Sequence, residues 1–423
     1  MHIKTLDRSV VPSFVVPNSF EFQKVNSFTF SNGIYVHALE AGNQPIIKLE
    51  LSFVAGTCQD NASFESYFTA KLLDQGTTKK SNEQIAEFVA FRGAHLEFIS
   101  GNEKIIVVIY SLKKHLKSVC ELVFEVLNDS QFNQNNLDRV KKIEFQGLEI
   151  KETKTSHIAS RKFISNLFPN HYYGKSLHSS FIEPIELENL KQFYLRYLVG
   201  AKFDLFVSGA ADDESLKCIE LIFGQHSVFS KENDSNTILE SNLGIEKITK
   251  KGALQASIRY GFQTINKLHV DYPLLSITNE IFGGYFGSKL MTNIREEKGY
   301  TYGIGSHISQ LKHASYFQIA TDVKAENADD TLKEINLEID KMCQEKISIE
   351  ELTKVRNYIV GNFANSLNTP FELMDKFRAV HLVGLDYSFY NTYFETLKSI
   401  TPDDIQNASQ KYLTETPAIV ICG

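Results

Sequence analysis

Two hydrophobic periods run along the chain and predict a mixture of strands and helices. Apolar and polar residues alternate in Ile46 to Val54 (IIKLELSFV), which predicts a half-buried β-strand. Apolar residues three and four positions apart predict a helix over Leu116 to Leu127. Short signals mark the ends of other elements. Asn32-Gly33 predicts a tight hairpin turn, and the sequence from Ser81 to Gln84 predicts a capping box that begins a helix.

The order of the predicted elements in the first half of the chain returns in the second half. The predicted strand Ala256 to Phe262 corresponds to Ile46 to Val54. The predicted strands Phe203 to Ser208 and Ala418 to Cys422 close the two halves, and each is followed by a glycine. A repeat unit that takes up about half of the chain is too long for a solenoid repeat and indicates a duplicated domain.

The repeat predicts an α+β protein made of two homologous α/β-sandwich halves, each a sheet with helices packed on one face. We expect an N-terminal domain over residues 1–228 and a C-terminal domain over residues 251–423. Residues 229–250 are polar and poor in aromatic side chains, so we interpret them as the linker between the domains.

The segment from Ile281 to Ser306 (IFGGYFGSKLMTNIREEKGYTYGIGS) is unusually rich in glycine, cationic and aromatic residues. Its glycines, Gly283, Gly284 and Gly287, predict a loop in which the backbone turns sharply. Ser288 is placed to cap a helix from Lys289 to Glu297, with Leu290, Met291 and Ile294 inward and Arg295 outward. Arg295 and Tyr302 lie seven positions apart, across a helix end and a strand start, which allows them to share one surface. An ordinary helix-to-strand connection with an exposed arginine and a packed tyrosine explains the same pattern.

Composition narrows the classes of partner and compartment. The 423 residues have a formal net charge of -7, which argues against nucleic acid as the main partner. No apolar run is long enough to span a bilayer, and the first residues do not resemble a signal peptide. Five scattered cysteines without a Cys-x-x-Cys motif favour free thiols. We therefore expect a cytoplasmic protein.

Nearly the whole chain resembles the pitrilysin/insulinase metallopeptidases, in particular the short members of the processing-peptidase type. The resemblance is sharpest in SKLMTNIREEKGYTYGIGS, which looks like the signature of the family's second half. The segment FIEPIELENLKQFYLRYLVGAKFDLFVSGA looks like the end of its first half. The resemblance implies two homologous α+β domains in each chain, and two such chains that close into a chamber.

The zinc motif that this resemblance leads us to expect is missing. Family members carry His-x-x-Glu-His on the first long helix, in which two histidines bind zinc and the glutamate acts as general base. Gly76-Thr77 fixes the register, and the motif positions are then Tyr67, Ala70 and Lys71. The region of the third ligand keeps Glu144 and Glu149. The comparison implies that this chain holds no metal and that the expected zinc belongs to a partner subunit.

The second element that family members use is present. By resemblance, Tyr302 donates a hydrogen bond to the scissile carbonyl, and Arg295 holds a backbone carbonyl of the substrate. The glycines Gly283, Gly284 and Gly287 correspond in place to a loop that helps substrates enter in the non-catalytic subunit of processing peptidases.

Together these residues imply a zinc-less subunit of a heterodimeric peptidase that cleaves peptides or unfolded polypeptides. The partner would be a homologous chain with His-x-x-Glu-His, and the chain alone would be inactive or form a similar homodimer. The rival prediction is a structural or peptide-binding family member without any peptidase role. A self-sufficient peptidase with a novel site has little support in the sequence.

Overall fold

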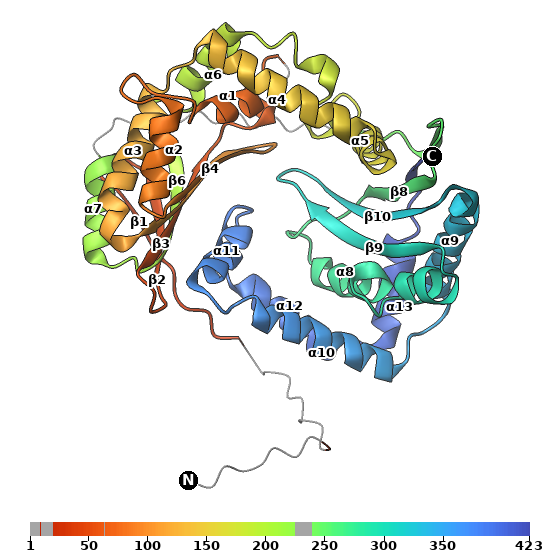
Figure 1. Ribbon diagram of the computed structural model, residues 1–423. Helices are drawn as coiled ribbons and strands as arrows, with labels where there is room; N and C mark the ends of the chain where they lie inside the picture. Colours follow the sequence, from red (N-terminus) through yellow and green to blue (C-terminus); the bar gives the residue numbers. More distant parts are fainter. Residues whose placement is uncertain (1–8, 10–19, 63, 225–238) are drawn as a thin grey trace.

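The first half of the chain folds around a six-stranded sheet. In the computed structural model, which describes residues 9, 20–62, 64–224 and 239–423, helices lie on the outer side of this sheet (Figure 1). Its strands are β1 (Asn26–Thr29), β2 (Tyr35–Glu40), β3 (Ile46–Phe53), β4 (His95–Ser100), β5 (Ile105–Leu112) and β6 (Phe203–Gly209). Its helices are α1 (Glu65–Leu72), α2 (Asn82–Phe91), α3 (Leu116–Asp129), α4 (Gln134–Glu152), α5 (Thr155–Leu167), α6 (Leu187–Tyr197) and α7 (Asp213–Phe223), with short 3₁₀ turns η1 (Thr57–Gln59), η2 (Lys113–His115), η3 (Tyr172–Gly174) and η4 (Ser179–Phe181).

The second half is built around a five-stranded sheet. Its strands are β7 (Gly244–Ile248), β8 (Gln255–Gln263), β9 (Thr301–Gln310), β10 (Ser315–Lys324) and β11 (Ala418–Cys422). Its helices are α8 (Tyr272–Asn279), α9 (Ala328–Gln344), α10 (Ile349–Asn365), α11 (Pro370–His381), α12 (Ser388–Ser399) and α13 (Pro402–Tyr412), with the π-helical segments η5 (Glu280–Gly284) and η6 (Met291–Glu297) and the 3₁₀ turn η7 (Ala325–Asn327).

The two sheets share one topology, which confirms the predicted duplication. The strand order is β1-β2-β6-β3-β5-β4 in the first sheet and β7-β11-β8-β10-β9 in the second. In both, the last strand lies between the first two core strands, parallel to one and antiparallel to the other. The hairpin at Gly33 and the capping box between Ser81 and Gln84 are also present. All five cysteines are free thiols.

The segment interpreted as a linker is more structured than the sequence indicates. Its residues 229–238 lie outside the described part of the chain, but Gly244–Ile248 forms β7, which pairs in parallel with β11. Its residues are exposed or only partly buried at the edge of the sheet, so its composition is that of a polar loop. Edge strands of this kind lack the apolar period that identifies a buried strand.

Helix α5 comes from the first half of the sequence but packs on the second sheet. Ala159, Phe163 and Leu167 form a core with the β11 residues Ala418 and Val420. Figure 1 shows α5 reaching across to β8. On β8, the buried guanidinium of Arg259 donates a hydrogen bond to Ser160 Oγ over 2.9 Å. The second sheet is therefore covered on its inner face by a helix from the other half.

Helix α11 makes the reciprocal crossing, onto the first sheet, where it lies beside β6 in Figure 1. Lys48 Nζ is 3.0 Å from Asp375 Oδ1, and Glu50 Oε2 is 2.7 Å from Arg378 NH1. Burial alone would lower the pKa of Lys48, but Glu50 and Asp375 raise it above its ordinary value. The prediction of a half-buried β3 was therefore wrong, because its polar face lies under α11 and every residue after Ile46 is buried.

The described residues contain no helix that is both long and apolar enough to cross a bilayer.

The contact between β2 and α11 predicts that acid destabilises the fold. Burial, and then the charge of His381, lower the pKa of His37 to about 4, and the two rings lie 4.2 Å apart. The pKa of His381 is itself lowered by burial, with opposing influences from Asp204 and Lys104. A folded pKa below the unfolded value means that stability is complete above about pH 6.5 and is lost as the pH falls towards 4. His37→Gln should remove up to ~3 kcal/mol of that loss.

Thermal unfolding between pH 7.5 and 4.5 tests this expectation for the wild type and His37→Gln. The exposed His95 provides a matched control, His95→Gln, on strand β4. If His37→Gln and His95→Gln change the pH dependence of Tm equally, the contact with His381 is not the cause.

Candidate functional site

The segment after α8 is a widened helix rather than the α-helix and loop that the sequence predicts. Helix α8 continues into the π-helical η5, and a second π-helical segment, η6, follows the glycines. At the end of η6 the amide of Lys298 bonds to the carbonyl of Asn293, five residues back, over 2.9 Å. Short π-helical segments inside α-helices are rare and occur frequently at functional sites. Leu290, Met291 and Ile294 are buried as predicted.

The three glycines of this segment are required for close packing and not for sharp turning. None of them has a positive φ, and Gly283 and Gly284 are helical. A Cβ on Gly283 would lie 2.4 Å from Ser306 Oγ, and one on Gly284 would lie 2.5 Å from a carboxylate oxygen of Glu280. A Cβ on Gly287 would lie 2.8 Å from the ring of Tyr285. The predicted turning loop was therefore wrong, and the role of these glycines in substrate binding stays a prediction.

Ser288 does not cap the following helix. Its side chain is completely buried, and its hydroxyl has no hydrogen-bond partner among the described residues. Its backbone carbonyl, by contrast, accepts a bond from the amide of Thr292 over 2.9 Å. The residue therefore stands directly before the helix that begins at Lys289, as predicted, but its hydroxyl does not form the predicted cap.

Arg295 and Tyr302 are brought together on one surface. The guanidinium carbon of Arg295 lies 5.6 Å from the centre of the Tyr302 ring, within the range of a cation–π contact. It lies closer still, at 4.5 Å, to the ring of Phe286, which sequence reasoning did not identify. Within the described chain, neither the Arg295 guanidinium nor the Tyr302 hydroxyl has an ion-pair or hydrogen-bond partner. The pair is therefore available to a molecule outside this chain.

A β-bulge directs the Tyr302 side chain away from the sheet. Strand β9 is the edge strand, and its register with β10 shifts between Thr321 and Val323, so that Tyr302 and Gly303 lie opposite Asp322 alone. The hydroxyl of Thr321 holds this bulge by donating to the carbonyl of Gly303 over 3.0 Å. Bulges at sheet edges commonly redirect a side chain next to an active site. Tyr302 is consequently 93% exposed and adjoins a cavity of about 630 Å³.

The positions of the family's zinc motif form a hydrogen-bonded cluster without a metal-binding donor set. The hydroxyl of Tyr67 donates to Glu144 Oε2 over 2.7 Å, and Lys71 Nζ lies 3.3 Å from Glu144 Oε1. Burial, and then the bond to Glu144, raise the pKa of Tyr67. Ala70 is buried and Glu149 is exposed on the other side of α4.

These residues do not fit zinc. The phenol and the carboxylate already satisfy one another, and the lysine ammonium occupies the place where a cation would bind. Among the described residues no three His, Cys, Asp or Glu side chains gather closely enough to hold a metal ion. A zinc site needs three or four such donors.

Comparisons with known proteins place the chain in a family. Residues 36–184 match the profile of the insulinase family, peptidase family M16. Residues 184–359 match the profile described as the peptidase M16 inactive domain. The chain belongs to the M16 peptidase family.

Known M16 proteins resemble the chain over most of its length. A protein of Rickettsia felis named "Uncharacterized zinc protease" is 22% identical over 416 residues, covering 95% of this chain and 98% of that protein. A probable inactive metalloprotease of Bacillus subtilis, YmfF, is 21% identical over 315 residues and covers 72% of each chain. The crystal structure of a peptidase M16 inactive domain from Pseudomonas fluorescens has a TM-score of 0.85, with 22% identity and coverage of 94% and 98%.

These similarities confirm the predicted pitrilysin-like fold and family. Together with the donor set at Tyr67, Ala70 and Lys71, they support a non-catalytic M16 member. The contact between Phe286 and Arg295 was missed because an aromatic residue between glycines has no characteristic pattern in the sequence. The signal available was its position in the same glycine-rich segment.

The Tyr67–Glu144–Lys71 cluster predicts how this M16 protein responds to zinc. The purified chain should not take up stoichiometric zinc when it is dialysed against the metal, because the Glu144 carboxylate is already engaged by Lys71 and Tyr67. The double variant Tyr67→His and Lys71→His should bind about one equivalent, since two histidines would then converge with Glu144 on one site. Elemental analysis measures both results.

Adding Glu144→Gln to the double-histidine variant provides the control and should abolish zinc binding. Stoichiometric zinc in the unmodified chain would contradict the assignment of these positions.

Proposed function

We propose that this M16 protein is the zinc-less subunit of a two-chain peptidase and supplies Arg295 and Tyr302 to the active site of a homologous zinc-bearing partner. The observation that carries the proposal is that the exposed Tyr302 and the half-buried Arg295 lie side by side, and neither functional group has an ion-pair or hydrogen-bond partner in the described chain. The substrates would be peptides or unfolded polypeptides, and the compartment the cytoplasm. The chain alone would be inactive.

The geometry of the pair supports a role towards another molecule. A tyrosine that stabilises a fold buries its ring, whereas Tyr302 buries almost none of it. The ring of Phe286 contacts the Arg295 guanidinium and limits its freedom before any ligand binds. A cation held in this way loses little conformational entropy when it engages a substrate.

Each residue has a distinct part in the proposed reaction. The phenol of Tyr302 would donate a hydrogen bond to the scissile carbonyl oxygen, on which negative charge grows as the bond is attacked. Arg295 would hold a neighbouring backbone carbonyl in both the ground state and the transition state. The partner's zinc would supply the activated water. The division places the metal on one chain and the carbonyl-binding groups on the other.

A second function, a structural or peptide-binding role without peptidase activity, is favoured by the relative YmfF, which is named a probable inactive metalloprotease. The two functions differ in what they require of Tyr302. A scaffold does not need its hydroxyl group, whereas a completed active site does.

The peptidase proposal predicts a large effect of Tyr302→Phe on turnover. In the complex of this chain with a homologue that carries His-x-x-Glu-His, kcat for an unfolded peptide should fall ~10²–10³-fold, the usual cost of losing one oxyanion donor. KM should change little, because the carbonyl gains its charge only in the transition state. Arg295→Ala should instead raise KM, since it removes a contact made in both states.

Tyr35→Phe is a matched control, because Tyr35 is also exposed and also carries a cation over its ring, Lys202 at 3.9 Å. It should leave kcat and KM unchanged, and all three variants should keep the wild-type Tm. If Tyr302→Phe keeps full kcat in an intact complex, the chain does not donate this hydroxyl, and the scaffold function is supported.

A further inference from the structure

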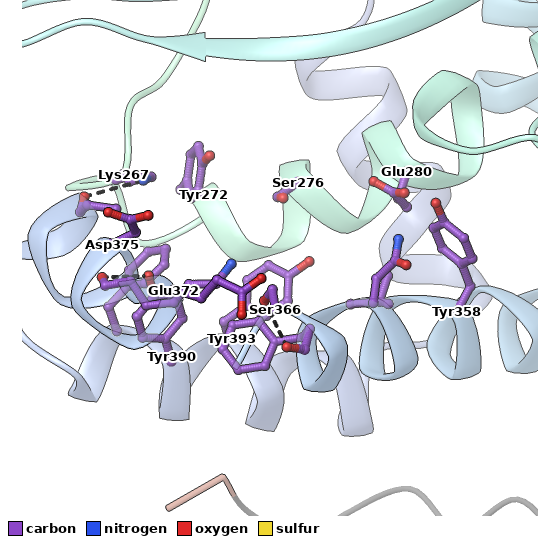
Figure 2. A pocket seen from close by; sticks show the side chains of 16 residues that line it. Lys267, Tyr272, Ser276, Glu280, Tyr358, Ser366, Glu372, Asp375, Tyr390 and Tyr393 are labelled. Carbon is purple, nitrogen blue, oxygen red and sulfur yellow. Dashed lines mark hydrogen bonds between the residues drawn. The ribbon is translucent and has the colours of Figure 1, made fainter. Parts of the chain in front are cut away.

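A second cavity of about 630 Å³ lies between α8, α10, α11 and α12, away from the Arg295–Tyr302 pair. Figure 2 shows Tyr272 and Ser276 of α8 on one side and Ser366, Tyr390 and Tyr393 on the other. Its volume falls within the ~300–1,000 Å³ of typical ligand pockets. By the order of elements, α8 and α10 correspond to α1 and α4, so this cavity occupies the place that the Tyr67–Glu144–Lys71 cluster fills in the first half.

Two lysines at one end of the cavity lack a carboxylate partner among the described residues. Lys267 Nζ donates only to the backbone carbonyl of Ala379, over 3.4 Å. Lys376 Nζ lies 5.1 Å from the centre of the Phe363 ring. Burial, and then the charge of Lys376, lower the pKa of Lys267, and both side chains line the same cavity. Burial also lowers the pKa of Lys376.

The carboxylates at the same end are already engaged. Asp375 Oδ1 accepts a hydrogen bond from Lys48 and lies 3.5 Å from Arg378. Glu372 Oε2 accepts bonds from the amide and hydroxyl of Thr369, at the start of α11. Asp375 and Glu372 raise the pKa of Lys376, but burial lowers it by more, so this pKa stays below its ordinary value. The two ammonium groups therefore present an incompletely compensated positive charge to the cavity.

The rest of the cavity is aromatic and ends in polar groups. Its walls carry six aromatic rings: Tyr272, Tyr358, Phe363, Phe389, Tyr390 and Tyr393. At the end opposite the lysines, burial raises the pKa of the Glu280 carboxyl above its ordinary value. In Figure 2, Glu280 and Tyr358 lie at this far end, and Lys267 lies at the other. The cavity thus has a cationic end, an aromatic body and a polar far end.

We propose that this cavity binds a carboxylate joined to an aromatic side chain, as at the C-terminus of a peptide that ends in phenylalanine or tyrosine. The carboxylate would pair with Lys267 and Lys376, and the aromatic side chain would pack among the tyrosines. A free aromatic acid has the same chemistry. The proposal depends only on the cavity, so it stands whether or not Arg295 and Tyr302 complete a peptidase.

Binding would be favourable because it relieves a cost already present in the free protein. A buried ammonium group without a counter-ion is destabilising, and a ligand carboxylate supplies that counter-ion. A charge-assisted hydrogen bond to such an anion is about twice as strong as a neutral one. The same reasoning predicts that a ligand with an amide in place of the carboxylate binds weakly.

Fluorescence polarisation of the full chain with an N-terminally labelled Gly-Gly-Phe peptide tests the proposal. The peptide with a free carboxylate should bind. The same peptide with a C-terminal amide should bind at least about tenfold more weakly. Competition by unlabelled 3-phenylpropionate distinguishes the two possible ligands, a peptide C-terminus and a free aromatic acid. Competition at a concentration similar to that of the unlabelled peptide supports a free aromatic acid, and much weaker competition supports a peptide terminus.

Lys267→Met and Lys376→Met should each weaken binding of the free-acid peptide about tenfold. Both should keep or raise Tm, because they remove a half-buried charge that has no ion-pair partner among the described residues. Lys354→Met is the matched control, since Lys354 is an exposed lysine on α10 that pairs with Glu350, and it should bind as the wild type does. Equal binding of acid and amide, unchanged binding in both lysine variants, or no binding of peptide and acid at all would overturn the proposal.

Discussion

Each half of the chain contributes one helix, α5 or α11, to the sheet of the other half. This exchange is the constraint on which the rest of the structure depends. It places Lys48 and Glu50, two charged residues in the centre of a β-strand, under a helix that comes more than three hundred residues later. Their side chains are about 5% exposed, and their charges are tolerated because they pair with one another and with Asp375 and Arg378 of α11. Removing one member of such a buried pair typically costs about 3–5 kcal/mol.

Because of this exchange, neither half is complete alone. Without α5 the second sheet would expose the apolar residues of β11 and the guanidinium of Arg259. Without α11 the first sheet would uncover Lys48 and Glu50, which would keep only their contact with one another, 3.0 Å between Nζ and Oε1. The relative position of the halves is therefore fixed by their cores. The edge strand β9, with Tyr302, and the helix pair α1 and α4 are positioned relative to one another by these shared cores.

Local chemistry was predictable from the sequence, and contacts between distant elements were not. The strand β3, the hairpin at Gly33 and the buried face of η6 follow from periodicity and turn residues over a few positions. The burial of the polar face of β3 depends on a helix in the other half, and no pattern within nine residues contains that information. The same limit applies to the glycines, whose packing partners Ser306 and Glu280 are visible only in three dimensions.

The candidate site shows a similar division. The spacing of Arg295 and Tyr302 suggested a shared surface, and the structure brings the two together. The bulge that exposes Tyr302 arises from the register between two strands, and Phe286 joins the pair through a loop conformation. The cavity with Lys267 and Lys376 draws its walls from four helices and a loop, so no short motif could identify it.

The cluster of Tyr67, Glu144 and Lys71 has a consequence for descent. If the chain derives from a zinc-binding ancestor, single substitutions would not easily return it there. A histidine at Lys71 alone would still face a carboxylate held by Tyr67, and a histidine at Tyr67 alone would share that carboxylate with an ammonium group. Each single substitution removes an existing contact before a metal can replace it. Restoring a carboxylate at Ala70 would be a third substitution. Loss of the metal would therefore be difficult to reverse, and selection would then act on the surface through which the chain contacts other molecules.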